Sequence, residues 1–240
     1  MLRVDEVTVN FGGLRAIDSL NLDVEQAMIT GLIGPNGAGK TTTFNVITGL
    51  QRPDSGRIYL GSRDITSLGP SARARLGLGR TFQRLELFGS LSARDNILVA
   101  LESRRVHGRK ARQLADDLLD RMGLGEVAGT QTDVLSTGTA RLVELARALA
   151  CEPTVLLLDE PSSGLDSAES NRLGALLSEL ALLGVAVLLV EHDMGLVMRV
   201  CSRIHVLDFG RLIASGTPEQ VSRDPQVQAA YLGTAPMGAP

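Results

Sequence analysis

A glycine-rich segment that ends in a lysine and two threonines offers the clearest chemistry in the sequence. It fits the pattern G-x-x-x-x-G-K-T and consists of Gly34, Pro35, Asn36, Gly37, Ala38, Gly39, Lys40, Thr41 and Thr42. Glycines let successive backbone N–H groups turn inward around an anion, and the N-terminus of a following helix adds partial positive charge. A lysine at this position reaches the β- and γ-phosphates of a nucleotide, and the first threonine hydroxyl ligates Mg²⁺. The segment therefore predicts a nucleotide-phosphate site with Thr41 as a metal ligand.

Two carboxylates follow a second apolar run. Val155 to Leu158 has the composition of a buried strand, and Asp159 and Glu160 come directly after it. Ligands of open α/β sheets bind in the crevice at the carboxyl ends of the strands, so these side chains are expected to face the nucleotide. We predict that Asp159 holds Mg²⁺ and that Glu160 takes a proton from the attacking water.

The elements that must position these residues alternate between strand and helix patterns. Short apolar segments predict strands at residues 2–11, 19–24, 28–33, 57–60, 154–158, 185–190, 203–207 and 211–214. Helical patterns follow Lys40, cover much of residues 92–150, and run from Asp166 to Gly184. This alternation predicts an α/β fold with a mainly parallel sheet. The long helical stretch before Ala150 predicts an inserted lobe.

Composition excludes several classes of protein. The chain has 240 residues, a formal net charge of −3 and only 3% aromatic residues, which argues against a nucleic-acid groove. Cys151 and Cys201 lack paired spacing, so neither a disulfide framework nor a zinc site is predicted. No run of about 18 apolar residues indicates a membrane span, and the first residues do not form a signal peptide.

Several motifs together give the chain a family resemblance. They are D-E-P (159–161), S-S-G-L-D (162–166), E-H (191–192) and L-S-T-G-T (135–139). In their order along the chain they resemble an ABC-transporter ATP-binding subunit, and the resemblance covers residues 2–233. It implies a P-loop NTPase fold of the ABC type, with an N-terminal antiparallel β portion and a helical lobe at about residues 88–150 inserted in the catalytic core. Residues 234–240 are expected to form a flexible tail.

The resemblance also implies roles for residues outside the two motifs described first. Gln83 is expected to contact Mg²⁺ and the attacking water, and His192 is expected to sense the γ-phosphate. With Glu160 they form the implied catalytic set. Phe11 is expected to stack on adenine, and Asp166 is expected to contact a second subunit.

The segment L-S-T-G-T departs from the family's usual L-S-G-G-Q. Ser136 and Gly138 are kept, whereas Thr137 replaces glycine and Thr139 replaces glutamine. The resemblance implies that Ser136 and Gly138 meet the nucleotide of the opposing subunit. Ser136 alone also fits an ordinary helix N-cap, and the two roles are compatible.

Finer matches narrow the resemblance. The segments F-G-G-L-R-A-I-D (11–18), G-R-T-F-Q (79–83) and E-H-D-M (191–194) resemble the ATP-binding subunits of branched-chain amino acid importers. Lipopolysaccharide-export ATPases share parts of this pattern. The resemblance implies ATP and Mg²⁺ as cofactors, and as partners a second ATP-binding subunit (a homologue or a second copy), permease subunits and, indirectly, an extracytoplasmic solute-binding protein. No nucleic-acid partner is expected, and the predicted location is the cytoplasmic face of the membrane.

Two other functions were weighed against this one. An ABC-type ATPase acting on nucleic acid or ribosomes conflicts with the net negative charge and the few aromatic residues. A P-loop small-molecule kinase would use Lys40 and Asp159 but would leave Glu160, His192 and the L-S-T-G-T segment without a role.

Overall fold

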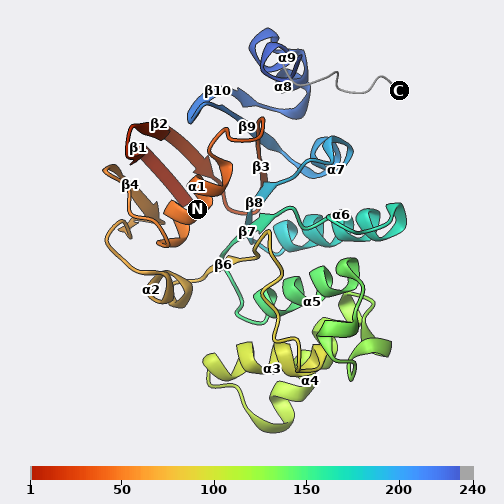
Figure 1. Cartoon of the computed structure of the whole chain (residues 1–240). Helices are drawn as coiled ribbons and strands as arrows, with labels where there is room; N and C mark the ends of the chain where they lie inside the picture. Colours follow the sequence, from red (N-terminus) through yellow and green to blue (C-terminus); the bar gives the residue numbers. More distant parts are fainter. Residues whose placement is uncertain (1, 233–240) are drawn as a thin grey trace.

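The strands form two sheets in the computed structural model, which describes residues 2–232 (Figure 1). The first sheet is antiparallel, has the order β2-β1-β4-β5 and consists of β1 (Leu2–Phe11), β2 (Leu14–Val24), β4 (Ser55–Leu60) and β5 (Arg63–Asp64). The second has the order β10-β9-β3-β8-β7-β6 and consists of β3 (Ile29–Ile33), β6 (Leu78–Arg80), β7 (Val155–Asp159), β8 (Ala186–Val190), β9 (Arg203–Asp208) and β10 (Arg211–Gly216). All neighbours in it are parallel except β9 and β10. The predicted fold class is confirmed.

Helices cover the second sheet and form a separate group at one end of the molecule. The helices are α1 (Lys40–Thr48), α2 (Pro70–Arg75), α3 (Ala93–Ser103), α4 (Gly108–Arg121), α5 (Thr137–Leu149), α6 (Ser167–Leu182), α7 (Met194–Val200), α8 (Pro218–Arg223) and α9 (Pro225–Leu232), with 3₁₀ turns at Gly125–Val127 and Thr132–Val134. Figure 1 places α3, α4 and α5 together, on the far side of α6 from the strands β1 and β2. These helices lie in the range predicted for the lobe, whose limits at 88 and 150 stay a prediction. The expected tail, 234–240, lies outside the described residues.

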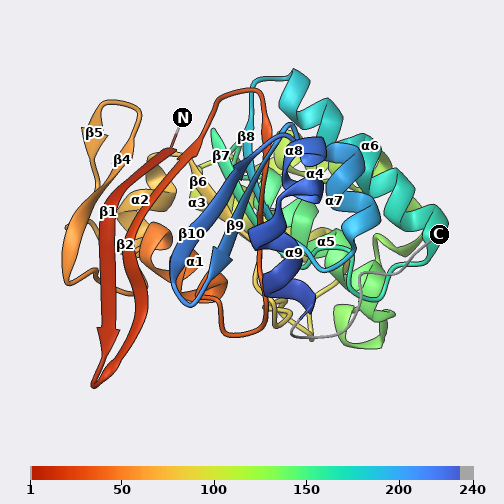
Figure 2. The ribbon, with the colours of Figure 1, turned by 90° about the horizontal axis from the view of Figure 1, so that it is seen from above.

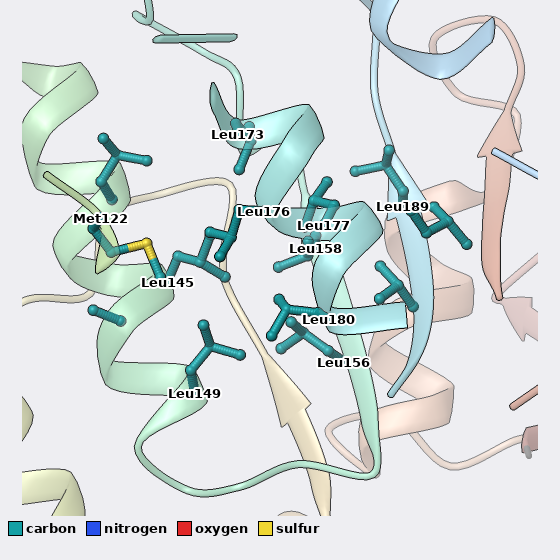
Figure 3. Close-up of a cluster of buried hydrophobic side chains, with 14 of the residues drawn as sticks. Met122, Leu145, Leu149, Leu156, Leu158, Leu173, Leu176, Leu177, Leu180 and Leu189 are labelled. Atoms are coloured by element: carbon teal, nitrogen blue, oxygen red, sulfur yellow. The ribbon is translucent and has the colours of Figure 1, made fainter. Parts of the chain in front are cut away.

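The larger sheet is the middle layer of the core. Every residue of β7 and β8 is buried. Alternate residues of β7 face opposite sides: Leu156 and Leu158 pack against α5 and α6, whereas Val155 and Leu157 pack toward α1 and the antiparallel sheet. Figure 3 shows the first of these layers, in which leucines of α5, α6, β7 and β8 meet. Burial on both faces explains why these strands are continuous apolar runs in the sequence.

Some short elements differ from the sequence-based prediction. The second strand begins at Leu14 rather than at Ser19, because the Gly12-Gly13 turn pairs Phe11 directly with Leu14. The segment before Arg80, for which no helix or strand was predicted, contains α2 and β6. Both are too short for a hydrophobic period, and β6 forms by parallel pairing with β7.

A buried arginine of α2 holds the far end of α1. The Arg73 side chain, 1% exposed, donates hydrogen bonds to the carbonyl oxygens of Val46 and Ile47, both at 2.6 Å. It also donates to the carbonyls of Leu68 at 2.8 Å and Thr66 at 2.9 Å. The last carbonyls of a helix have no partner within the helix, so Arg73 caps the helix that follows the glycine-rich loop. Burial lowers the pKa of Arg73 to about 10, which leaves it protonated at neutral pH.

We expect Arg73→Met to lower the free energy of unfolding by about 3 kcal/mol, because four buried or partly buried carbonyl groups lose a donor. Urea unfolding followed by circular dichroism measures this change. Arg75→Met on the exposed side of α2 is the matched control and should stay within about 0.5 kcal/mol of the wild type. Equal stability of the two variants would contradict the capping role.

Candidate functional site

The glycine-rich loop connects β3 to α1 and is fixed by close backbone contacts. Gly34 has a φ of +153°, and a Cβ there would lie 2.1 Å from the carbonyl oxygen of Leu207. Gly39 has a φ of +104°, and its Cβ would lie 2.7 Å from the carbonyl oxygen of Ala16. Helix α1 starts without a side-chain cap or an acidic residue in its first turn. Its N-terminal N–H groups therefore point to a site suited to an anion.

Lys40 lies at the first position of α1 and folds over the loop. Its ammonium donates to the carbonyl oxygens of Gly34 at 2.6 Å and Pro35 at 2.9 Å. Burial lowers the pKa of Lys40, and the nearby carboxylates of Glu160 and Asp159 act in the opposite direction. The predicted phosphate ligand thus lies beside the predicted carboxylates. Thr41 and Thr42 occupy the same first turn, with Thr41 exposed.

Three residues that lie far apart in the sequence meet at Glu160. This residue follows β7 with a φ of +51°, a left-handed conformation that is uncommon for a side chain other than glycine. Its Oε1 is 3.0 Å from Nε2 of His192 and accepts a hydrogen bond from Nε2 of Gln83 at 3.4 Å. The structure therefore brings together the three residues predicted to be catalytic, which come after three different strands, β6, β7 and β8.

Glu191 is a residue of this site that the sequence analysis gave no role of its own. Its side chain is 4% exposed and accepts hydrogen bonds from the backbone N–H of Ser162 at 2.7 Å and of His192 at 3.0 Å. It thereby ties the loop after Glu160 to the loop that carries His192. The only signal in the sequence was its place next to the histidine, after a buried strand.

Asp159 pairs with a buried arginine that the sequence analysis also missed. Oδ2 of Asp159 is 3.5 Å from Nη2 of Arg80, and both side chains are almost fully buried. Arg80 donates to Asn45 of α1 at 2.8 Å, and its guanidinium lies over the ring of Phe82, 4.7 Å from the centroid. Burial raises the pKa of Asp159, while Arg80 acts to lower it. Arg80 therefore balances the charge of the predicted metal ligand.

The L-S-T-G-T segment forms the start of α5. Ser136 is the N-cap, and its Oγ accepts from the N–H of Thr139 at 3.1 Å. Ser136 is exposed, whereas Gly138 is buried. A Cβ at Gly138 would lie 2.7 Å from the carbonyl oxygen of Gly164 in the same chain. The capping alternative for Ser136 is therefore confirmed, and the close approach at Gly138 is to the segment before Asp166.

The remaining predicted residues lie on two exposed turns. Asp166 is the N-cap of α6 and forms a capping box with Glu169. Phe11 is 49% exposed at the end of β1, where it pairs with Leu14. Contacts of these residues with adenine or with a second subunit stay predictions.

Comparisons of this chain with family models and with known proteins point to the same family. The model of the ABC transporter family matches residues 17–163, and the model described as a branched-chain amino acid ATP-binding cassette transporter matches residues 211–236. The chain is 40% identical to the high-affinity branched-chain amino acid transport ATP-binding protein LivG of Escherichia coli (strain K12), covering 98% of both chains. It is 38% identical to the lipopolysaccharide export system ATP-binding protein LptB of Acidithiobacillus ferridurans, covering 90% of each.

A solved structure extends the likeness to the fold. A dimeric ATP-binding cassette in a post-hydrolysis state, bound to ADP and Pi, superposes with a TM-score of 0.84. It is 27% identical in sequence, and the match covers 91% of this chain and 99% of that one.

Burial of the Asp159 carboxyl makes stability depend on pH, and Arg80 limits that dependence. A carboxyl whose pKa is higher in the folded than in the unfolded chain contributes its stability below the unfolded pKa and loses it as pH rises through the folded pKa. Arg80→Met removes the cation that lowers the pKa of Asp159, so this pKa should be higher in the folded variant than in the folded wild type. The free energy of unfolding that the variant loses relative to wild type should therefore increase as pH rises. We expect the variant to lose about 1 kcal/mol more, relative to wild type, at pH 8 than at pH 5.

Urea unfolding of both proteins at the two pH values measures this difference. Adding Asp159→Asn to the Arg80→Met variant should remove the extra loss at pH 8. An equal loss at both pH values would mean that Arg80 acts through packing alone.

Proposed function

The chain belongs to the ABC transporter family, and from this membership we propose that it hydrolyses ATP to power transport of a small solute through a separate membrane permease. As a member of the family it is an ATP-binding protein and an ATPase. The solute we propose is a branched-chain amino acid or a related metabolite, because the C-terminal family match and the likeness to LivG both point there. The observation that carries the catalytic part is the meeting of Glu160, His192 and Gln83.

The proposed mechanism assigns a task to each group at the site. Backbone N–H groups of residues 34–42 and the Lys40 ammonium bind the phosphates. To do so, Lys40 gives up its hydrogen bonds to the carbonyl oxygens of Gly34 and Pro35. Glu160 takes the proton of the attacking water. His192 and Gln83 hold its Oε1, so the carboxylate stays oriented toward the position of the γ-phosphate. Phe11 stacks on adenine.

The residues present also fit a magnesium ion held mainly by phosphates. Among residues 2–232 no cluster of three histidine, cysteine or acidic side chains could hold a metal alone. Oxygen donors are nevertheless available from Thr41, from Gln83 and from Asp159, and hard oxygen ligands suit Mg²⁺. When bound, the ion would neutralise charge on the β- and γ-phosphates.

We propose that a complete site needs two subunits. Ser136 is exposed at the N-terminus of α5, where a helix end and a hydroxyl suit phosphate oxygens. With Gly138 and Asp166 it would face the nucleotide on a second ATP-binding subunit, either a second copy or a homologue. The similarity to a dimeric cassette supports this arrangement.

A groove between the sheet and the helical lobe suits the permease. It has a volume of about 930 Å³ and is lined by residues of α2, β6, α3 and α5. Leu50 and Val99, which are 54% and 39% exposed, lie along it and offer apolar contacts to a short helix. No helix among residues 2–232 is long and apolar enough to cross a bilayer. From the family membership and this groove we propose a place on the cytoplasmic face, against permease subunits that receive solute from an extracytoplasmic binding protein.

Lipopolysaccharide export is the second candidate, because the chain is also similar to LptB over 90% of its length. The affinity-tagged chain, purified from membranes with its permease, separates the two. Stimulation of phosphate release by branched-chain amino acids and their binding protein supports import. Stimulation by lipopolysaccharide alone would favour export.

We expect Glu160→Gln to keep ATP affinity within about twofold and to slow phosphate release by roughly 10²–10⁴-fold, the usual size of a general-base contribution. Glutamine preserves shape and hydrogen bonding but loses the basic oxygen. Phosphate release and nucleotide titration of the purified chain give both values. Glu152→Gln, an exposed glutamate outside the site, is the control. Wild-type turnover in Glu160→Gln would remove it as the base.

The two-subunit site can be tested at the N-cap of α5. Aspartate and asparagine cap helices as well as serine does, so Ser136→Asp and Ser136→Asn should both fold normally. Only Ser136→Asp adds a negative charge opposite the triphosphate of the second subunit. We expect both to bind ATP as single chains, and Ser136→Asp alone to lose ATP-dependent dimerisation and turnover, by about 100-fold.

Sedimentation with ATP and phosphate release read out the two effects. If Ser136→Asp dimerises and turns over as well as Ser136→Asn, Ser136 is a helix cap only.

A further inference from the structure

The segment that carries Gln83 is held by side chains rather than by its own backbone. Residues 82–87 lie between β6 and the helical lobe and have no regular structure. In the described part of the chain, their backbone groups form no hydrogen bond with other backbone groups. Side chains of α5 take that place: Arg141 donates to the carbonyl oxygens of both Phe82 and Gln83.

Two further residues on the same face of α5 hold the next turn of this segment. Oε1 of Glu144 accepts from the N–H of Glu86 at 3.3 Å, and Arg147 donates to the Glu86 carbonyl at 2.5 Å. Spacings of three residues place Arg141, Glu144 and Arg147 along one side of the helix. We name these three side chains the α5 clamp.

The α5 clamp is costly to bury, which argues against packing as its purpose. Arg141 is 8% exposed and Glu144 is 1% exposed, and they form an ion pair of 3.4 Å. Burial raises the pKa of Glu144, against the effects of its hydrogen bond and the two arginines. A buried ion pair is often no more stable than apolar residues of the same size. What apolar residues could not supply are the donors and acceptor that fix the backbone of residues 82–86.

The clamp acts on the residue that reaches the catalytic carboxylate. The Gln83 carbonyl is held by Arg141, and the Gln83 side-chain amide donates to Glu160 at 3.4 Å. We propose that Arg141, supported by Glu144, is a positioning residue that fixes the Gln83 backbone so that its amide meets Glu160. This inference rests on the proposed ATPase mechanism. Through these contacts α5, whose N-cap is Ser136, is connected to the hydrolytic site of its own chain.

A double-mutant cycle tests the proposal. Arg141→Met alone would leave Glu144 buried and unpaired, so the clamp is opened with Arg141→Met combined with Glu144→Gln. We expect kcat for ATP to fall about 10–100-fold with KM and single-chain ATP affinity within about twofold, since misplacing a catalytic group by about 1 Å costs this much. In a Gln83→Ala background the same pair of changes should cost less than about threefold, because the group that it positions is absent.

Hydrogen exchange gives a readout that does not depend on turnover. Exchange in the full chain should rise in residues 82–88 of the clamp variant, at the Glu86 N–H that Glu144 accepts, and stay unchanged elsewhere in the lobe. Arg141→Lys keeps the charge but loses the paired donors, and should lie between wild type and the double variant in both kcat and exchange. This milder variant tests the proposal even if the double variant folds poorly.

Arg94→Met is the matched control. It removes the ion pair of 2.6 Å between Arg94 and Asp116, which joins α3 to α4 in the same lobe, and should leave kcat and exchange in residues 82–88 unchanged. The proposal is overturned if the loss of kcat is undiminished in the Gln83→Ala background, or if exchange in residues 82–88 does not rise. A wild-type chain that releases no phosphate would instead overturn the proposed function, and the exchange result would still decide whether the clamp holds this segment.

Discussion

Asp159 ends a strand whose five residues are all buried, and Glu160 follows it directly; an ionised carboxylate in or beside such surroundings is costly without cations or donors near it. Each neighbouring element supplies one. Arg80 from β6 pairs with Asp159, and the ammonium of Lys40, at the start of α1, lies near both carboxylates. His192, after β8, contacts Glu160. The requirement to compensate two adjacent negative charges therefore decides which side chains follow the strands around β7.

The topology of the larger sheet makes this compensation possible. Strands β3, β8, β7 and β6 are parallel neighbours, so their carboxyl ends meet at one edge. In Figure 2 this sheet lies between the antiparallel strands β1 and β2 and the helices α6 and α7. Each end then carries a functional group: the glycine-rich loop follows β3, Glu191 and His192 follow β8, and Gln83 follows β6. Because both faces of β7 and β8 are covered by apolar layers, these groups have a rigid support and only the edge is open to a ligand.

Much of this could be predicted from the sequence, because the residues concerned carry local signals. Lys40 follows a spaced glycine pattern, and Glu160 follows an apolar run, so both were found without a structure. The roles of Arg80 and Arg141 were not found, since an arginine within a strand or helix gives no local sign of the buried group that it meets. Asp159 is 79 residues from Arg80 along the chain, and Gln83 is 58 residues from Arg141. Such contacts depend on the packing of the lobe against the sheet.

The departure from L-S-G-G-Q has a physical explanation in the contacts of the segment after Glu160. The two positions of the glycine pair differ in the space around them. Thr137 lies against Gly164: a Cβ at position 164 would be 3.2 Å from the Thr137 side chain, so the glycine at 164 leaves space for a side chain at 137. A Cβ at position 138 would lie 2.7 Å from the carbonyl oxygen of Gly164, so there is no room for a side chain there. Oγ1 of Thr139 in turn lies 2.8 Å from Oγ of Ser136, so the two hydroxyls share a hydrogen bond at the start of α5. The substitution at 137 is thus accommodated within the chain, whereas the glycine at 138 is required by the chain's own packing.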